Sequence, residues 1–374
     1  MSDVGIRLRV TEVELVDNLY LFGAPGIGKT EVIRQKAKEE AKKLGRVFVD
    51  LRTWRGADDK TPISFDDVFK NPSKYYVFLR VPAPHIMPED FAIPAKNPDP
   101  NARYYEQIPP KAFRVMSLPG IAGVLFLDEL NNVHRFDQIT ALFALLQEKD
   151  IGWSDKLSPD IKVVAAGNPP EMSSVANPLP LPMRGGRLIV VWVDPPTVDE
   201  WIEYMVKTYK DAWDVRTAAY LKIYPNDLFK PPVEDDGVSP YPTPRSWTRL
   251  ALELYRFRDN EKFSIAMAYG LLGKEVGQRF EAVIRAHLTP QELDNLERHP
   301  GEFDGLEEAK KIFVITAVAN NPRKYAKLLK HIASKNRDYF VLSLVMMKPS
   351  DRMWAINELR DEVADTLDAI ANYM

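Results

Sequence analysis

The residues whose types and spacing most clearly suit chemistry form a glycine-rich stretch near the start of the chain, Gly23-Ala24-Pro25-Gly26-Ile27-Gly28-Lys29-Thr30. Their spacing fits the pattern of a phosphate-binding loop. The glycines let the backbone curl so that its N–H groups point at phosphate oxygens, and the start of a following helix adds partial positive charge. Lys29 would then reach the β- and γ-phosphates of a nucleotide, and the Thr30 hydroxyl would be a ligand of Mg²⁺. The alternative is a glycine-rich turn without a ligand.

Two acidic residues, Asp128 and Glu129, end an apolar run that begins at Gly123. Such a run is typical of a parallel strand buried on both faces, and α/β folds bind their ligands at the carboxyl ends of these strands. Asp128 suits a carboxylate that holds Mg²⁺ through its water shell, and Glu129 suits a base that orients and activates an attacking water. The alternative is a strand that continues into an acidic loop.

A neutral amide, Asn168, ends a second apolar run that starts at Lys162. An amide can hold both a water and a γ-phosphate without adding charge. Asparagine is also common in turns, and two prolines follow it. We favour the functional interpretation because the neighbouring predicted strand carries Asp128 and Glu129.

Three arginines are candidates for sensing phosphate charge. Arg184 and Arg187 precede the last predicted strand, and an arginine on a short turn can reach a neighbouring subunit and stabilise phosphoryl-transfer charge. Arg245 falls at the second position of a helix that Thr243 can cap and Pro244 can begin. The helix dipole repels a cation there, which favours an anionic ligand for Arg245. The alternative for all three is a solvated surface arginine.

The elements that would position these residues alternate between strands and helices. The segments with a strand pattern are 18–22, 46–51, 75–81, 123–129, 162–168 and 188–193, of which 75–81 is expected as an extra strand. Helical patterns cover 31–44 and 136–148. This alternation predicts an α/β fold with a doubly wound parallel sheet.

The strand pattern stops at Asp194, which predicts a nucleotide-binding domain over 1–194 and a helical region over 195–374. In the second region helical patterns cover 198–209, 245–256, 275–286, 306–319, 323–334 and 354–371. Two proline-rich stretches interrupt the elements. We interpret 82–110 as a surface insertion that excludes a helix, and 230–244 as an extended connector.

Composition narrows the class of protein. The 374-residue chain has a net charge of −3, which gives no global attraction to nucleic acid or anionic membranes. It has no cysteine, and its five histidines form no H-E-x-x-H pair, so we expect neither disulfides nor a protein-built zinc site. The sequence contains no run of about 18 apolar residues, so we expect no membrane span. Residues 1–5 lack the basic start of a signal peptide. We therefore expect a cytoplasmic protein.

With these motifs in order, the chain resembles the AAA+ ATPases, and within them the MoxR branch. The resemblance covers residues 18–250 well and the remainder only as a helical extension. It rests on Gly23–Thr30 (Walker A), Val124–Asn131 (Walker B), Ala165–Pro169 (sensor 1), Arg187 (arginine finger) and Thr243–Trp247 (sensor 2).

The resemblance implies a P-loop NTPase αβα sandwich followed by an all-helical lid and a C-terminal helical extension. It implies Mg²⁺-dependent ATP hydrolysis in a homo-oligomeric ring, usually a hexamer, with the active site at the subunit interface. It also implies chaperone-like remodelling of a client protein or assistance in metal insertion, often with a von Willebrand factor A domain partner. Arg245 would respond to the γ-phosphate in cis. Because the finger region departs from the usual Asp or Asn, Arg, Phe and reads Gly186-Arg187-Leu188, both Arg187 and Arg184 remain candidates in trans.

Two other surfaces leave alternatives open. Tyr104 and Tyr105 are either pore aromatics or, as is commoner for such residues, packed against the sheet. A basic run includes Arg323, Lys324, Lys327, Lys330, Lys335 and Arg337. It is either a solvated helix face, a partner for the acidic residues of 351–374, or a contact for nucleic acid, which we consider the weakest of the three. A nucleic-acid motor and a scaffold that binds ATP but barely hydrolyses it are the competing functions.

Overall fold

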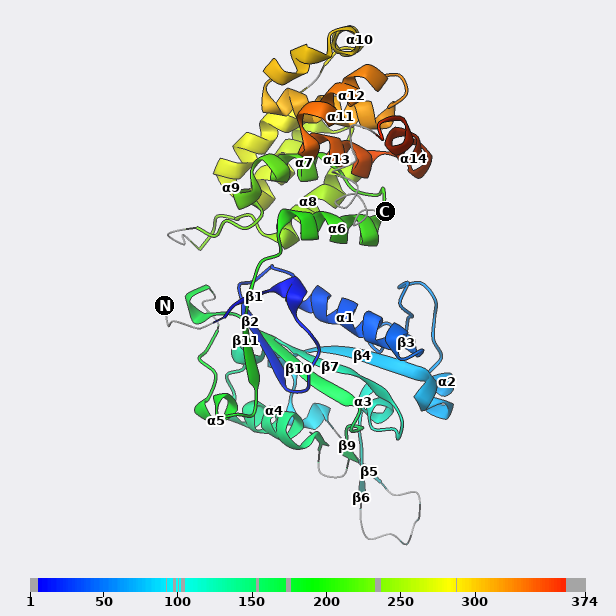
Figure 1. Ribbon diagram of the computed structural model, residues 1–374. Helices are drawn as coiled ribbons and strands as arrows, with labels where there is room; N and C mark the ends of the chain where they lie inside the picture. The colour runs from blue at the N-terminus through cyan, green and yellow to red at the C-terminus, as the bar shows by residue number, and fades with distance from the viewer. Residues whose placement is uncertain are drawn as a thin grey trace. The chain divides into compact units, whose positions relative to one another are not determined.

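The computed structural model describes residues 6–360, apart from residues 92, 97, 98, 100, 102–104, 153, 154, 173–175, 233–236 and 287. Backbone contacts divide the chain into two compact units, Met1–Pro195 and Pro196–Met374. The first unit contains all the strands in the described part of the chain, and the second is built from helices (Figure 1).

The first unit is organised around a seven-stranded parallel sheet with the order β1-β11-β2-β10-β7-β4-β3. The strands are β1 (Leu8–Arg9), β2 (Leu19–Gly23), β3 (Val47–Asp50), β4 (Tyr75–Pro82), β7 (Ala122–Asp128), β10 (Ile161–Gly167) and β11 (Ile189–Asp194). Every residue of β7 is buried, as expected for a strand covered on both faces. The carboxyl ends of β2, β10, β7 and β4 therefore form one edge, which is where the predicted motifs end.

Helices cover both faces of this sheet (Figure 1). They are α1 (Lys29–Lys43), α2 (Phe65–Lys70), α3 (Lys111–Met116), α4 (Phe136–Glu148) and α5 (Leu181–Arg184). On one face α1 buries Ile33, Ala37 and Ala41. On the other, Leu142 and Leu145 of α4 and Met116 of α3 join one apolar core with strand residues. A parallel sheet between two helical layers, followed by a helical region, confirms the predicted P-loop AAA+ fold class.

The structure confirms the expected extra strand and adds two small hairpins that were not predicted. The segment expected as an extra strand is β4, which lies inside the sheet between β3 and β7. The proline-rich insertion contains an antiparallel hairpin of β5 (Ile93–Lys96) and β6 (Tyr105–Ile108), and a second small hairpin joins β8 (Asp150–Ile151) to β9 (Asp155–Lys156). Tyr105 is 64% exposed on β6, so the expectation that it packs against the sheet is wrong. Tyr104 lies outside the described residues.

The second unit packs its helices around a cluster of aromatic rings. The helices are α6 (Val198–Tyr209), α7 (Arg216–Ile223), α8 (Pro244–Arg256), α9 (Glu261–Arg285), α10 (Pro290–Arg298), α11 (Glu308–Asn320), α12 (Ala326–Lys335), α13 (Arg337–Met346) and α14 (Pro349–Glu358). Tyr220, Trp247 and Phe280 contact one another in its fully buried centre. The helix α9 kinks at Gly273, whose φ is 75° and whose Cβ, if added, would lie 2.4 Å from the Pro240 carbonyl oxygen.

Acidic residues of the second unit meet part of the basic run. Arg323 pairs with Asp351 at 3.4 Å and Lys324 with Asp294 at 2.8 Å. Pairing with acids was one of the alternatives that the sequence left open, and Asp351 belongs to the acidic set that it named. Glu358 of that set is exposed at the end of α14. Residues 361–374, which include the other four acidic residues of the set and the end of the helix predicted over 354–371, lie outside the described residues. None of the described helices is both long and apolar enough to cross a membrane.

Candidate active site

The phosphate-binding loop joins the buried strand β2 to the first turn of α1. Gly26 and Gly28 have φ values of 77° and 102°, which glycine adopts without steric cost. Gly23 is required for a different reason, because a Cβ there would lie 2.5 Å from the Val193 carbonyl oxygen. Gly28 is also the N-cap of α1 and supplies no side-chain hydrogen bond. The N–H groups that begin α1 thus have no side-chain acceptor from this cap, which suits them to an anion.

Lys29 connects the loop to the end of β10. Its side chain is buried, with 8% of the residue exposed. The ammonium donates to the carbonyl oxygens of Gly23 at 2.6 Å and Ala24 at 2.8 Å, and to Asn168 Oδ1 at 2.9 Å. Two predicted site residues that are far apart in the sequence therefore meet directly.

Thr30 and Asp128 meet in the same way at the end of β7. The Thr30 hydroxyl donates to Asp128 Oδ2 at 3.0 Å. Because its proton points at the carboxylate, the hydroxyl keeps its lone pairs for another ligand. A hydroxyl and one carboxylate fit Mg²⁺, which retains several waters and uses nucleotide phosphates as further ligands. Among the described residues no three acidic, His or Cys side chains form a metal-binding cluster of their own.

Arg80 adds a cation to this carboxylate. Its Nε and a terminal nitrogen donate to Asp128 Oδ2 at 2.9 and 2.7 Å. The Asp128 side chain is only 10% exposed, whereas that of Arg80 is 37% exposed. Arg80 thus neutralises and fixes a carboxylate that is nearly cut off from water.

Glu129 lies directly after Asp128 and is exposed. Its backbone adopts φ 59° and ψ 39°, a left-handed conformation that is uncommon for residues other than glycine. Its carboxylate accepts a hydrogen bond from Asn132 Nδ2 at 3.2 Å. A carboxylate held at the carboxyl edge of the sheet and open to solvent can accept a proton from a water molecule.

The two candidate finger arginines lie at the other end of the sheet. In the parallel pairing of β11 with β2, Ile189 is opposite Leu19, so the chain enters β11 beside the start of β2 and far from the phosphate-binding loop. Arg184 ends α5 and is exposed. Arg187 donates from Nε to Gln147 Oε1 at 2.8 Å and lies over the Phe143 ring, both on α4. The structure thus does not bring either arginine to the residues around Lys29 of the same chain.

Arg245 belongs to the second unit, where the predicted helix start is confirmed. Thr243 is the N-cap of α8, its hydroxyl accepts from the Ser246 N–H at 3.1 Å, and Pro244 is the first helical residue. Arg245 follows as the second helical residue and is exposed. Its role toward a phosphate therefore remains a prediction.

Two groups near the loop, one half-buried and one fully buried, have shifted pKa values. Burial raises the pKa of the Glu31 carboxyl, in the first turn of α1, although Arg34 and Lys38 act in the opposite direction. Burial also raises the pKa of the Tyr20 hydroxyl on β2. That hydroxyl has no hydrogen-bond partner among the described residues.

Sequence reasoning gave no task to two residues of this site, Arg80 and Asn131, of which Asn131 ends the Walker B segment. Arg80 is the one charged residue in the apolar run 75–81, and that is the signal that could have identified it. Asn131 follows the acidic pair, is 4% exposed, and donates to the Asn168 carbonyl oxygen at 2.7 Å. An amide two positions after two candidate catalytic acids is a weaker signal, because only the fold reveals its partners.

Comparisons with known proteins found distant matches among solved structures alone. No model of a known protein family matches the sequence, and no curated protein matches it significantly. Among solved structures, NtrX from Brucella abortus in complex with ADP is 14% identical with a TM-score of 0.37, and the match covers 94% of this chain and 66% of NtrX. The ORC2 protein from Aeropyrum pernix is 12% identical with a TM-score of 0.34, over 95% of this chain and 90% of ORC2.

Proposed function

We propose that this chain binds ATP with Mg²⁺ at the phosphate-binding loop and hydrolyses it. The observation that carries the proposal is the convergence of Lys29, Thr30, Asp128 and Asn168 through two hydrogen bonds, from Lys29 Nζ to Asn168 Oδ1 at 2.9 Å and from Thr30 Oγ1 to Asp128 Oδ2 at 3.0 Å. These side chains come from a loop and two strand ends, and they enclose the place where the N–H groups of α1 would receive phosphates.

Each residue has a distinct task in this proposal. Lys29 and the loop N–H groups from Gly23 to Thr30 bind the β- and γ-phosphates, and Thr30 and Asp128 hold the metal. When bound, Mg²⁺ supplies positive charge that stabilises the phosphoryl group during transfer. Glu129 accepts a proton from the attacking water, and Asn168 holds that water in line. Arg245 responds to the γ-phosphate from the helical region.

The arginines support an oligomer as the active form. Arg184 and Arg187 are exposed at the end of the sheet opposite to the loop, so one of them would act on the nucleotide of a neighbouring copy. We propose a homo-oligomeric ring of the MoxR kind, most simply a hexamer, in the cytoplasm. In this ring hydrolysis would remodel or assemble a client protein, or help to insert a metal, with a von Willebrand factor A domain protein as a candidate partner.

Nucleotide binding is tested with a matched pair of lysine variants. Lys29→Ala should abolish binding of Mg²⁺-ATP, because the buried ammonium has no substitute in the loop. Lys43→Ala, at the exposed last residue of the same helix, should bind like the parent chain. Equal affinity of the two variants for ATP, measured by calorimetry, would contradict the proposed site.

The competing functions predict different measurements. A nucleic-acid motor should show ATPase activity that single-stranded DNA stimulates and that falls steeply with salt. A nucleotide-gated scaffold should assemble with ATP and turn over less than about once per hour, far below the typical enzymatic range. Our proposal expects turnover without DNA, and it expects a Glu129→Gln variant held in the ATP state to retain a client protein in a pull-down.

A further inference from the structure

Asn131, the last residue of the Walker B segment, makes an unusual set of contacts for a residue to which that motif gives no task. Its side-chain amide donates to the Asn168 carbonyl oxygen at 2.7 Å and to the Asn177 carbonyl oxygen at 3.1 Å, and its Oδ1 accepts the Asn168 N–H at 3.1 Å. Its backbone carbonyl also accepts the Asn177 N–H at 2.8 Å. One buried side chain thus binds both backbone groups of Asn168 and a second position further along the same loop.

The sequence leaves room for this arrangement at Gly167. A Cβ on Gly167 would lie 2.2 Å from Asn131 Oδ1 and 1.9 Å from the Tyr20 hydroxyl. Glycine at the end of β10 is therefore what lets the Asn131 amide approach the backbone of the next residue. The close fit indicates a specific contact rather than a polar side chain that fills space.

The contacts of Asn131 fix the direction in which Asn168 points. With its N–H and its C=O both bound to one amide, the Asn168 backbone cannot rotate without losing two partly buried hydrogen bonds. The Oδ1 atom of the Asn168 side chain accepts a hydrogen bond from the Lys29 ammonium at 2.9 Å. Asn131 thereby holds the Asn168 amide at the phosphate-binding loop without touching that loop itself.

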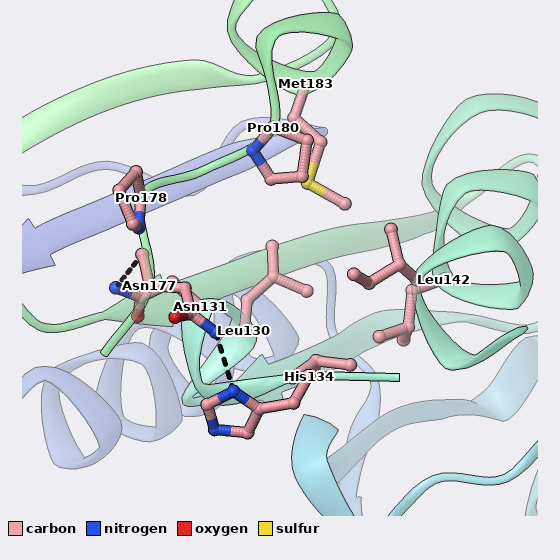
Figure 2. Close-up of a pocket in the computed structure, with 10 residues that line it drawn as sticks. Leu130, Asn131, His134, Leu142, Asn177, Pro178, Pro180 and Met183 are labelled. Carbon is pink, nitrogen blue, oxygen red and sulfur yellow. Dashed lines mark hydrogen bonds between the residues drawn. The ribbon is translucent and has the colours of Figure 1, made fainter. Parts of the chain in front are cut away.

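Asn131 also connects this point to the loop that leads into α5. Figure 2 shows Asn131 and Asn177 side by side at the edge of a cavity of about 100 Å³, whose wall includes Leu130, Leu142 and Met183. The Asn177 side chain in turn bonds His134 Nδ1 at 2.8 Å (Figure 2). The Asn177 side chain therefore contributes nothing to the Asn131 contacts, which use its backbone alone.

We infer that Asn131 is a positioning residue for the hydrolytic step: it orients Asn168 for the attacking water. The inference rests on the proposed ATPase function and gives a task to the last residue of the Walker B segment, for which the motif itself gives none. Nucleotide binding depends on Lys29 and the loop N–H groups, which Asn131 does not contact. Loss of Asn131 should therefore affect kcat and leave the affinity for ATP nearly unchanged.

The experiment is a double-mutant cycle with Asn131→Ala and Asn168→Ala. Each single variant should lower kcat by roughly 10- to 100-fold, the effect of a misplaced reacting group, with the Kd for ATP within about threefold of the parent. Because Asn131 acts through Asn168, the double variant should lose no more than the larger single loss. Losses that multiply in the double variant, or a parent-like kcat for Asn131→Ala, would overturn the inference.

Two further variants separate positioning from folding. Asn131→Asp has nearly the same shape and keeps an acceptor for the Asn168 N–H, but it cannot donate either bond, and it should also lower kcat with little change in Kd. Asn177→Ala loses only the bond to His134 and should retain the parent kcat within about twofold, as for a substitution outside the contacts. If Asn131→Ala does not fold, a parent-like kcat for Asn131→Asp overturns the inference on its own.

An NMR readout keeps this inference separate from the proposed function. The side-chain amide resonance of Asn168, assigned by its loss in Asn168→Ala, should shift in Asn131→Asp and stay in place in Asn177→Ala. An unmoved resonance in Asn131→Asp would contradict the positioning role whatever the ATPase assay shows. A parent chain that hydrolyses no ATP would instead contradict the proposed function.

Discussion

Lys29 and Asn168 lie 139 positions apart in the chain and are joined by a hydrogen bond of 2.9 Å from Nζ to Oδ1. The bond is possible because β2 and β10 are neighbours in the sheet: Asn168 directly follows β10, and Lys29 lies at the end of the phosphate-binding loop that follows β2. It links a residue that would bind phosphate to one that would hold the attacking water. Phosphate binding and the positioning of the attacking water would therefore take place at the same edge of the sheet.

Arg80 should stabilise the chain by neutralising Asp128. Replacing Arg80 with Met leaves a nearly buried carboxylate with fewer donors, and we expect the free energy of unfolding to fall by about 1–3 kcal/mol. Arg80→Lys should lose less, because it keeps the charge but not the two-pronged contact. Mg²⁺-ATP should reduce the deficit, since the metal supplies positive charge beside the same carboxylate. Urea unfolding with and without nucleotide measures each effect.

The control for Arg80 is an exposed ion pair in the same unit. Arg114 pairs with Asp155 at 3.4 Å, and its side chain is 48% exposed. Arg114→Met should change the unfolding free energy by less than about 1 kcal/mol, as is usual for surface pairs. Equal losses for the two substitutions would mean that Arg80 is an ordinary surface residue.

The position of Arg184 and Arg187 predicts that the active site is completed by a second copy. They lie before β11, a strand of six residues that spans about 20 Å, so neither reaches the loop of its own chain. Glu129→Gln should be inactive alone, and so should the alanine variant of whichever arginine acts in trans; the first pair to mix is Glu129→Gln with Arg187→Ala. When equal amounts of the two variants assemble at random, a working site needs Glu129 from one copy and Arg187 from its neighbour. About a quarter of the interfaces should have both groups, and ATPase activity should recover in proportion.

The same mixing experiment with Arg184→Ala identifies which arginine acts. Only the arginine that works in trans should give recovery when mixed with Glu129→Gln. Activity equal to the average of the separate samples, for both arginine variants, would argue against a shared site.

Glu31 should make the stability of the chain depend on pH. Burial raises its pKa above the ordinary value of 4.5. A carboxyl with a raised pKa in the folded state contributes stability below its unfolded pKa and loses that contribution as the pH rises through the folded value. Glu31→Gln should therefore be more stable than the parent at pH 7, and the difference should vanish as the pH falls below about 4.5.

The matched control for Glu31 is Glu39→Gln, which changes an exposed residue of the same helix. Its unfolding free energy should follow the parent across the whole pH range. A Glu31→Gln curve that also runs parallel to the parent from pH 4 to pH 7 would contradict the effect of burial.

The sequence was sufficient for the elements whose pattern is local. The local order of residues was enough to predict the buried strand β7 and the amphipathic helix α4. It also predicted the capped start of α8 at Thr243. Short helices without a long apolar period were missed, among them α7 with eight residues and α10 with nine. The capping box of Thr289 with Glu292 ahead of α10 was a usable signal.

The site could be predicted only where single motifs define it. Arg80 reaches Asp128 because β4 lies beside β7 with Pro82 opposite Asp128, and a strand pattern does not specify neighbours or register. Asn131 bonds backbone groups 37 and 46 positions away. These contacts depend on how distant segments fold together, so no local pattern could reveal them.

Glu129→Gln tests the central claim most directly, because it replaces the proposed base without changing the size of the side chain. We expect steady-state ATP hydrolysis to fall at least about 100-fold, the usual contribution of a general base, while the Kd for Mg²⁺-ATP stays within about threefold of the parent. Glu148→Gln, an exposed change at the end of α4, should hydrolyse ATP like the parent. A Glu129→Gln variant that also hydrolyses ATP at the parent rate would contradict the account.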